Sequence, residues 1–339
     1  MTHLGEYYAT RIYPGLSAAL SWIASPFPFS LTEIVVVLLL VAAVLLIVRA
    51  IRRHRPWWRC VLGELGLVLV AVVWLYGAWG LNYFRSSIYE RLETIPMPYE
   101  EGEFHAFLDH FAEELNENWC DVEVLDKERI EQEIKAWYST RPEECGLCPP
   151  RAWQHPKRLL FNRLYSAVGV LGFIGPAFDE MHINHDVSTQ EYPFIFAHEY
   201  AHVLGVSNEA EANFWAFEAC RASQDQAVRY SGWYMLLNYT ARNIYSLLGE
   251  EAYKEWADKL IPEVYDDLEF TRLHWQELRW PAIAKIQHAF YNFFLKTNRI
   301  SDGTKNYGQV LRLVLTLSDL YDNDHEHEHE AEAHDGTQG

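Results

Sequence analysis

The residues whose types and spacing are best suited to chemistry are His198, Glu199 and His202, in the sequence His-Glu-Tyr-Ala-His. Two histidines four positions apart on a helix project from the same face, so their imidazoles can bind one zinc ion. The glutamate is rotated by about 100° around that helix and can reach a water molecule on the zinc. Zinc lowers the pKa of its water toward neutrality, and a carboxylate can then accept the proton. The spacing therefore predicts a zinc peptidase in which Glu199 is the general base.

A pattern this short also arises by chance, and two histidines on an apolar helix can be ordinary core residues. The flanking residues favour the functional interpretation. Ser188 and Glu191 have the spacing of a capping box, which predicts a helix that begins near Thr189. The apolar residues 192–197 would bury its first turns, and Gly205 would end it. The motif then lies in the last two turns of a short, buried helix.

A catalytic zinc ion needs a third protein ligand and one open position. Glu209 lies in the first turn of a second predicted helix, with Asn208 as its N-cap and Glu211 closing a capping box. We assign Glu209 to the metal, and Asn213, one turn later, to a hydrogen bond with a ligand histidine. Glu211 is the alternative metal ligand, whereas Asn208, the third-ligand position of another zincin class, is a poor one. Both glutamates could also simply stabilise the helix N-terminus.

Two apolar runs precede the motif, at residues 31–51 and 60–82. As a helix each is about 30 Å long, which is enough to cross a bilayer. A buried core helix is the alternative for either run, but two such lengths in succession argue against it. The arginine-rich residues 52–59 between the runs indicate a cytoplasmic loop.

This hairpin would place both chain termini and a domain at residues 83–320 outside the cytoplasm, at the outer face of a cell membrane. Residues 1–30 have few charges and several aromatic side chains, and we expect a partly amphipathic segment at the outer membrane surface. Residues 321–339 alternate histidine and glutamate, a composition that cannot build a core. We expect this tail to be disordered, and either weak metal binding or solubility could explain it.

The formal net charge is −19, and only three of the 47 acidic residues lie before residue 83. A domain this acidic should repel nucleic acid and anionic lipid headgroups, which argues against a nucleic-acid partner. The acidity could favour cationic substrates, although solubility alone also explains it. The expected partners are a peptide or protein substrate outside the membrane and the lipid bilayer, and nothing in the sequence indicates an oligomeric state.

Four of the five cysteines would lie outside the membrane, where disulfides can persist. Cys145 and Cys148, separated by Gly-Leu, could form a small disulfide loop, a redox pair or half of a zinc site. No second pair has this spacing, so we favour a disulfide or free thiols.

The expected fold of the domain is mainly α with a small antiparallel β element, an α+β, zincin-like fold. Helical apolar spacing occurs at residues 99–118, 127–138, 210–223, 229–248, 252–261, 282–295 and 309–317. Residues 172–176 resemble a turn, and residues 180–185 alternate like a strand, whose edge often binds the substrate backbone in zincins. His182 and His185 would face opposite ways on that strand, which favours surface histidines over extra ligands.

Several segments in combination resemble the bacterial membrane proteins grouped as domain of unknown function 3810. They are residues 79–85, 197–202, 209–214, 220–223, 229–232, 295–298, 302–303 and 307–308. The resemblance covers most of residues 31–320 and implies a zinc peptidase with two spans, without naming a substrate. The Cys145/Cys148 pair and the histidine-rich tail depart from it. A looser similarity to gluzincins, whose third ligand begins a Glu-x-x-x-Asp/Asn pattern, supports Glu209 with Asn213.

The hypothesis is a membrane-anchored metallopeptidase that hydrolyses peptide bonds with a zinc-activated water. One zinc ion would be held by His198, His202 and Glu209. The oxyanion needs another donor, and Tyr307 is chosen because the family block includes it; Tyr230 and His274 are rivals. The alternative is a zinc-binding membrane scaffold or pseudo-peptidase, whose site a fourth protein ligand would close. An intramembrane protease is disfavoured because the apolar run at the motif is short and flanked by acidic residues.

Overall fold

The structure is a computed structural model that describes residues 2–54, 56–98, 100–285 and 308–318. Within these residues the chain is mainly helical, with one two-stranded antiparallel sheet. The expected class, mainly α with a small antiparallel β element, is therefore confirmed. Only the first four residues of the helix predicted at 282–295 are described, and the predicted tail at 321–339 lies outside the described residues.

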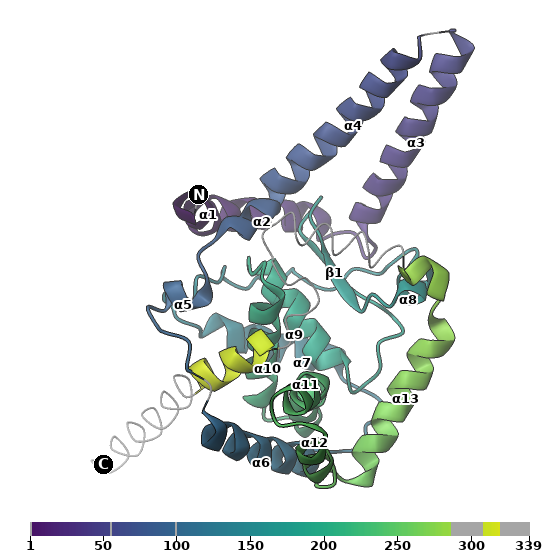
Figure 1. Ribbon diagram of the computed structural model, residues 1–339. Helices are drawn as coiled ribbons and strands as arrows, with labels where there is room; N and C mark the ends of the chain where they lie inside the picture. The colour runs from purple at the N-terminus through teal and green to yellow at the C-terminus, as the bar shows by residue number, and fades with distance from the viewer. Residues whose placement is uncertain (1, 55, 99, 286–307, 319–339) are drawn as a thin grey trace.

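Two antiparallel helices, α3 (Leu31–Arg52) and α4 (Trp57–Ala78), project from the rest of the molecule (Figure 1). Both are long and apolar enough to cross a membrane, and neither apolar stretch is buried inside the protein. α3 begins where the first apolar run begins, because the Ser30 side chain caps it by accepting from the Glu33 backbone. α4 includes residues 57–59, which were expected in the loop, and ends at Ala78, soon before the 3-10 helix η2 (Gly80–Phe84).

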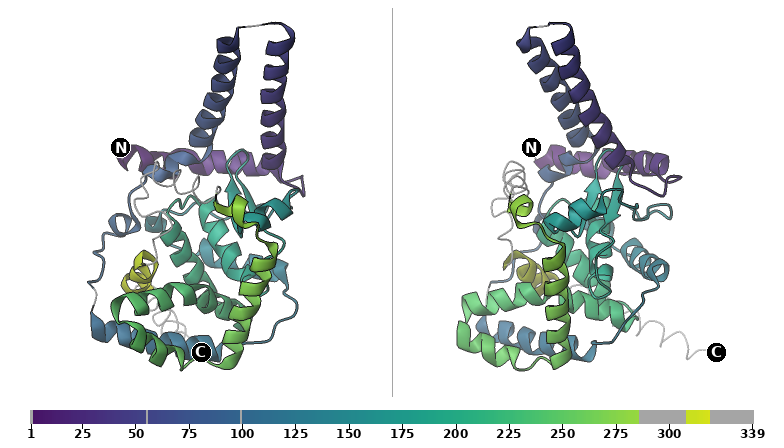
Figure 2. Two further views of the ribbon diagram at one scale, coloured as in Figure 1. Left: turned by 45° about the vertical axis from the view of Figure 1, so that its right-hand side comes forward. Right: turned by 90° about the vertical axis from the view of Figure 1, so that its right-hand side faces the viewer.

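The N-terminal segment is a helical rod that lies crosswise at the base of the α3–α4 pair (Figure 2). It consists of α1 (Thr2–Tyr7), the π-helix η1 (Tyr8–Ile12) and α2 (Tyr13–Ala24). Tyr8 and Tyr13 are buried and belong to the main core cluster of the protein. The segment expected at the membrane surface is thus also part of the folded domain.

The domain core surrounds α9 (Tyr192–Val203), against which α10, α11 and α7 all pack. α9 is buried on nearly every side because it is apolar around most of its circumference. The other helices of the domain are α5 (Ile88–Arg91), α6 (Glu101–Glu117), α7 (Lys127–Ser139), η3 (Glu143–Cys145), α8 (Asn162–Val168), α10 (Glu209–Arg221), α11 (Gln226–Leu247), α12 (Glu250–Ala257), α13 (Pro262–Leu278) and Gly308–Ser318. Of these, α5, η3, α8 and α13 have no counterpart among the sequence predictions.

The sheet pairs β1 (Gly172–Gly175) with β2 (Glu180–Ile183), in a register that places Phe173 opposite His182. The interpretation of residues 172–176 as a turn is wrong, since four of them form β1. On its other edge, β2 forms an isolated parallel β-bridge between His182 and Lys157. Within the described residues no strand pairs with the other edge of β1. The unpaired edge next to the motif helix, within the described residues, therefore belongs to β1, and not to the strand predicted from the sequence.

Candidate metal centre

Helix α9 begins at Tyr192, three residues later than Ser188 and Glu191 predict. The Glu191 carboxylate does reach back to Ser188, accepting from its backbone N–H at 3.0 Å and its hydroxyl at 2.9 Å. It also accepts from the indole Nε1 of Trp275 at 3.0 Å, which ties the start of α9 to α13. Gly205, at φ +94°, follows the helix end in the left-handed region that glycine tolerates best.

The three predicted ligands, His198, His202 and Glu209, converge at the end of α9 and the start of α10. The His198 and His202 Nε2 atoms are 3.2 Å apart. A Glu209 oxygen lies 3.4 Å from His198 Nε2 and 3.6 Å from His202 Nε2. Atoms bound to a tetrahedral zinc ion at about 2.0–2.1 Å lie roughly 3.3–3.4 Å from one another. The three side chains therefore fit one such ion without rearrangement of the helices.

Hydrogen bonds to neighbouring residues hold the histidine-bearing turn in place. His202 Nδ1 lies 2.7 Å from the Val206 carbonyl oxygen, which orients the ring so that Nε2 faces the cluster. The His202 carbonyl accepts from the Trp79 indole at 3.1 Å. The carbonyl of Ala197, just before the motif, accepts from the buried Tyr138 hydroxyl at 2.9 Å. These contacts preorganise the ring positions.

Glu199 is buried beside the cluster, and its Oε2 has no hydrogen-bond partner among the described residues. Burial raises the pKa of this carboxyl above its ordinary value. Gly172 of β1 packs directly on it: a Cβ added there would lie 2.6 Å from both Cγ and Oε1 of Glu199. A buried polar atom without a partner is expected where a substrate or a water molecule completes the site.

The charges in the cluster favour a cation between the two carboxylates. Burial by itself would lower the pKa of His202, but the carboxylates of Glu209 and Glu199 outweigh it and raise that pKa to about 9. Burial would likewise raise the pKa of Glu209, but the two histidines hold it well below its usual range. The negative charge that stabilises a protonated imidazole here would also stabilise a metal cation in that position.

Two other predicted site residues have different partners. The Asn213 side-chain amide donates to the Tyr239 hydroxyl at 3.1 Å, so the bond predicted to a ligand histidine is replaced by one to α11. Glu211, the alternative ligand, forms a buried ion pair with Arg91 and accepts from the Trp215 indole at 3.2 Å. It therefore closes no capping box, although Asn208 caps α10 as predicted.

Of the three candidates for stabilising an oxyanion, the two that the structure describes have partners other than the cluster. Tyr307 lies outside the described residues. The Tyr230 hydroxyl donates to Asp267 at 2.6 Å, and His274 Nε2 contacts the carbonyl of Asp186 at 2.6 Å. Both rivals thus have structural partners.

The interpretation of His182 as a surface residue is wrong. His182 is fully buried, stacked on Phe173, with Nε2 2.8 Å from the Ser30 hydroxyl at the start of α3. His185 is exposed, as expected. Cys145 and Cys148 are both buried and are not joined in a disulfide.

Two residues of the site, Trp79 and Gly172, were given no role from the sequence. Trp79 carries the usual sign of a membrane interface, a tryptophan directly after an apolar span. Gly172 was interpreted as the first residue of a turn, and its closeness to Glu199 follows only from the formation and position of β1.

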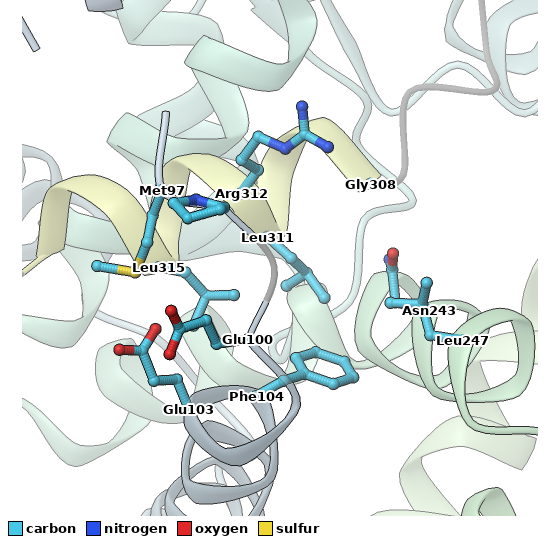
Figure 3. A pocket seen from close by; sticks show the side chains of 11 residues that line it. Met97, Glu100, Glu103, Phe104, Asn243, Leu247, Gly308, Leu311, Arg312 and Leu315 are labelled. Carbon is cyan, nitrogen blue, oxygen red and sulfur yellow. The ribbon is translucent and has the colours of Figure 1, made fainter. Parts of the chain in front are cut away.

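A separate pocket of about 220 Å³ lies between the loop before α6, α11 and the helix Gly308–Ser318 (Figure 3). Phe104, Leu311 and Leu315 form its apolar lining, and Glu100, Glu103 and Arg312 stand at its edge. It contains no residue of the metal cluster, so the cluster and this pocket are distinct features.

No curated protein and no solved structure matches the chain. A family model does match, over residues 8–315, and its description is "Protein of unknown function (DUF3810)". The match includes η1 and α2 of the N-terminal rod, both apolar helices, the sheet and the His198/His202/Glu209 cluster. Because it covers most of the 339 residues, the chain belongs to this family of unknown function.

Proposed function

We propose that this protein is a membrane-anchored zinc metallopeptidase with a zincin-like catalytic centre. The observation that carries the proposal is the mutual spacing of the His198, His202 and Glu209 ligand atoms, 3.2, 3.4 and 3.6 Å. Three protein ligands with an open fourth position are typical of catalytic rather than structural zinc. Within the described residues the cluster has no further His, Cys, Asp or Glu ligand, which favours an enzyme over a scaffold with a closed site.

In this mechanism His198, His202 and Glu209 would hold the zinc, and Glu199 would move the proton. A bound zinc ion would acidify a water molecule and polarise the substrate carbonyl. The buried Glu199 carboxylate accepts the proton of the attacking water and then delivers it to the departing amine.

The unpaired edge of β1 is the proposed binding surface for the substrate backbone. Gly172, at the start of this strand, touches Glu199, so a peptide paired along β1 would pass next to the general base. Extended peptides bind such edges through main-chain hydrogen bonds. This geometry favours an unfolded or extended segment over a folded protein surface.

The proposal places α3 and α4 across a bacterial membrane with the domain outside the cytoplasm. The loop that joins the two helices lies at their far end from the domain (Figure 1). That end carries Arg49, Arg52, Arg53 and Arg59. Arginines concentrate on the cytoplasmic side of short loops, so the opposite end faces outward.

The test uses the purified full-length chain in detergent, as wild type, Glu199→Gln and the control Glu277→Gln on the exposed face of α13. We expect about one zinc per chain in all three, by elemental analysis. We also expect cleavage of a peptide library that falls by about 10²–10⁴-fold only in Glu199→Gln. Zinc binding without cleavage by the wild type would instead support the scaffold, and a wild type without zinc would refute the metal centre.

A further inference from the structure

The metal cluster is attached to the end of an apolar span through Trp79. α4 ends at Ala78, and the indole of the next residue, Trp79, donates to the His202 carbonyl at 3.1 Å. The Trp79 ring also meets the His202 imidazole edge to face, with centroids 6.2 Å apart. One of the ligand histidines therefore lies within a side-chain length of the point where α4 leaves the membrane in the proposed topology.

The other span, α3, is also bound to the domain by hydrogen bonds. The buried Glu180 carboxylate accepts from the backbone N–H groups of Leu31 and Thr32, at 3.0 and 2.7 Å, at the first turn of α3. The Glu33 carboxylate accepts from the backbone of Leu160 and Phe161 at 2.6 and 3.1 Å. Neither span is joined to the domain by a flexible linker, so the height of the site above the bilayer is fixed.

The N-terminal rod provides a third attachment. The Tyr13 hydroxyl donates to the Val203 carbonyl, at the end of α9, at 2.8 Å. Lys157 Nζ donates to the carbonyls of Ala24 and Phe27, at 2.9 and 2.7 Å, where α2 ends. The rod is therefore fixed to the motif helix at one point and to the sheet region at another.

The outward face of this rod is apolar and lies at the base of the spans. Its exposed large side chains are Leu4, Tyr7, Ile12, Trp22 and Ile23, with Arg11 as the one charged residue that the described part of the rod exposes. Water disfavours such a face, whereas the interface between headgroups and acyl chains accommodates it, particularly tryptophan and tyrosine. The rod lies at the base of α3 and α4 (Figures 1 and 2), and this position identifies the bilayer as the occupant of its exposed apolar side chains.

We propose that the site cleaves polypeptides anchored in the same membrane, at bonds a few residues outside the bilayer. This inference rests on the proposed peptidase function. The site is held rigidly at the membrane surface. Most folded soluble proteins therefore cannot reach it, because they would collide with the bilayer or with the acidic domain. A membrane-anchored chain is delivered at the right height and at a high effective concentration.

The experiment compares two forms of one degenerate ten-residue linker library, with the full-length protein reconstituted in phosphatidylcholine nanodiscs. In one form a single apolar transmembrane helix in the same nanodisc carries the linker; in the other the same linkers are soluble peptides. We expect the tethered form to be cleaved at least about tenfold faster at equal bulk concentration. Moving the linker outward by a rigid helical spacer of about 30 Å should remove that advantage.

A second variant tests the rod. Trp22→Glu combined with Ile23→Glu should lower tethered cleavage several-fold and leave cleavage of the soluble library unchanged. The control Phe270→Glu replaces an equally exposed apolar side chain on α13 and should alter neither. Equal rates for soluble and tethered linkers in the wild type would overturn the membrane-substrate inference alone. Failure to cleave either form, with Glu199→Gln identical to wild type, would overturn the peptidase function and the inference with it.

Discussion

Because Gly172 has no Cβ, the backbone of β1 can lie close to Glu199, the proposed general base. A Cβ at this position would overlap Glu199, which must then move. Displacing a catalytic group by about 1 Å can cost roughly 100-fold in rate, so we expect Gly172→Ala to lose about 10- to 100-fold in peptidase activity. Zinc content should stay at the wild-type level. Gly102→Ala, where the added methyl meets open space, is the matched control and should be fully active.

Substitutions of Glu209 and of Glu211, two residues apart, are expected to have different effects. The first should reduce zinc affinity and the second should reduce stability. Glu209→Gln should lower zinc affinity by at least about tenfold, measured by chelator competition, and leave the folded state intact. Glu211→Gln leaves the buried guanidinium of Arg91 without its carboxylate, so it should lower the free energy of unfolding by about 3 kcal/mol. If Glu211→Gln were the variant that lost zinc while remaining stable, the assignment of the third ligand would be reversed.

At the scale of elements, Glu180 joins β2 to the first turn of α3. Its carboxylate accepts three hydrogen bonds there, from Leu31 N, Thr32 N and Thr32 Oγ1. Glu180→Ala would leave buried N–H groups unsatisfied, so we expect the free energy of unfolding to fall by about 1–3 kcal/mol. Thermal unfolding in detergent measures this, with the exposed Glu103→Ala as control. An unchanged midpoint would mean that α3 is attached to the domain by other contacts.

The elements that the sequence predicts well are those whose signals are local. α3, α4 and α10 follow from runs of apolar residues, from Gly and Asn at helix ends and from helical spacing. The converging His198, His202 and Glu209 belong to this class, because all three lie within one helix–turn–helix. β1 has only four residues, two of them glycine, and so shows no alternation.

The sequence predictions for His182 and Glu211 failed because each side chain contacts a residue that is distant in the sequence. His182 is buried because Ser30 and Phe173 surround it, and Ser30 is 152 positions away. Glu211 turns from the cluster because Arg91 approaches it from a distant loop. Spacing within a segment carries no information on such tertiary contacts, which is why capping and strand-face arguments misplaced both residues.

At the scale of the whole molecule, Asp179 makes the attachment of the N-terminal rod dependent on pH. This carboxyl accepts from Tyr13 at 2.9 Å and from Ser17, and its burial raises its pKa from 3.8 to about 6. Between these two values the folded chain retains a proton that the unfolded chain releases. The free energy of unfolding should therefore fall as pH rises from about 4 to 6, by up to about 3 kcal/mol, and not change further above that.

The measurement is thermal or denaturant unfolding of the full chain in detergent between pH 4 and 7. In Asp179→Asn this contribution is absent, so the difference in stability between variant and wild type should depend on pH only in that window. A difference that is constant across the range would show that Asp179 has the same pKa in both states.

The attachment of α3 also imposes an order on biosynthesis. The first turn of this helix is completed by Glu180 and by the backbone at Leu160 and Phe161, which the ribosome makes well over a hundred residues later. The hairpin would thus enter the membrane with its N-terminal N–H groups still hydrated, and they would gain their protein partners only when the sheet has been translocated and folded. Maturation of the hairpin and of the domain would then be one cooperative event, in which a chain that stops before β2 lacks the Glu180 acceptor for the first turn of α3.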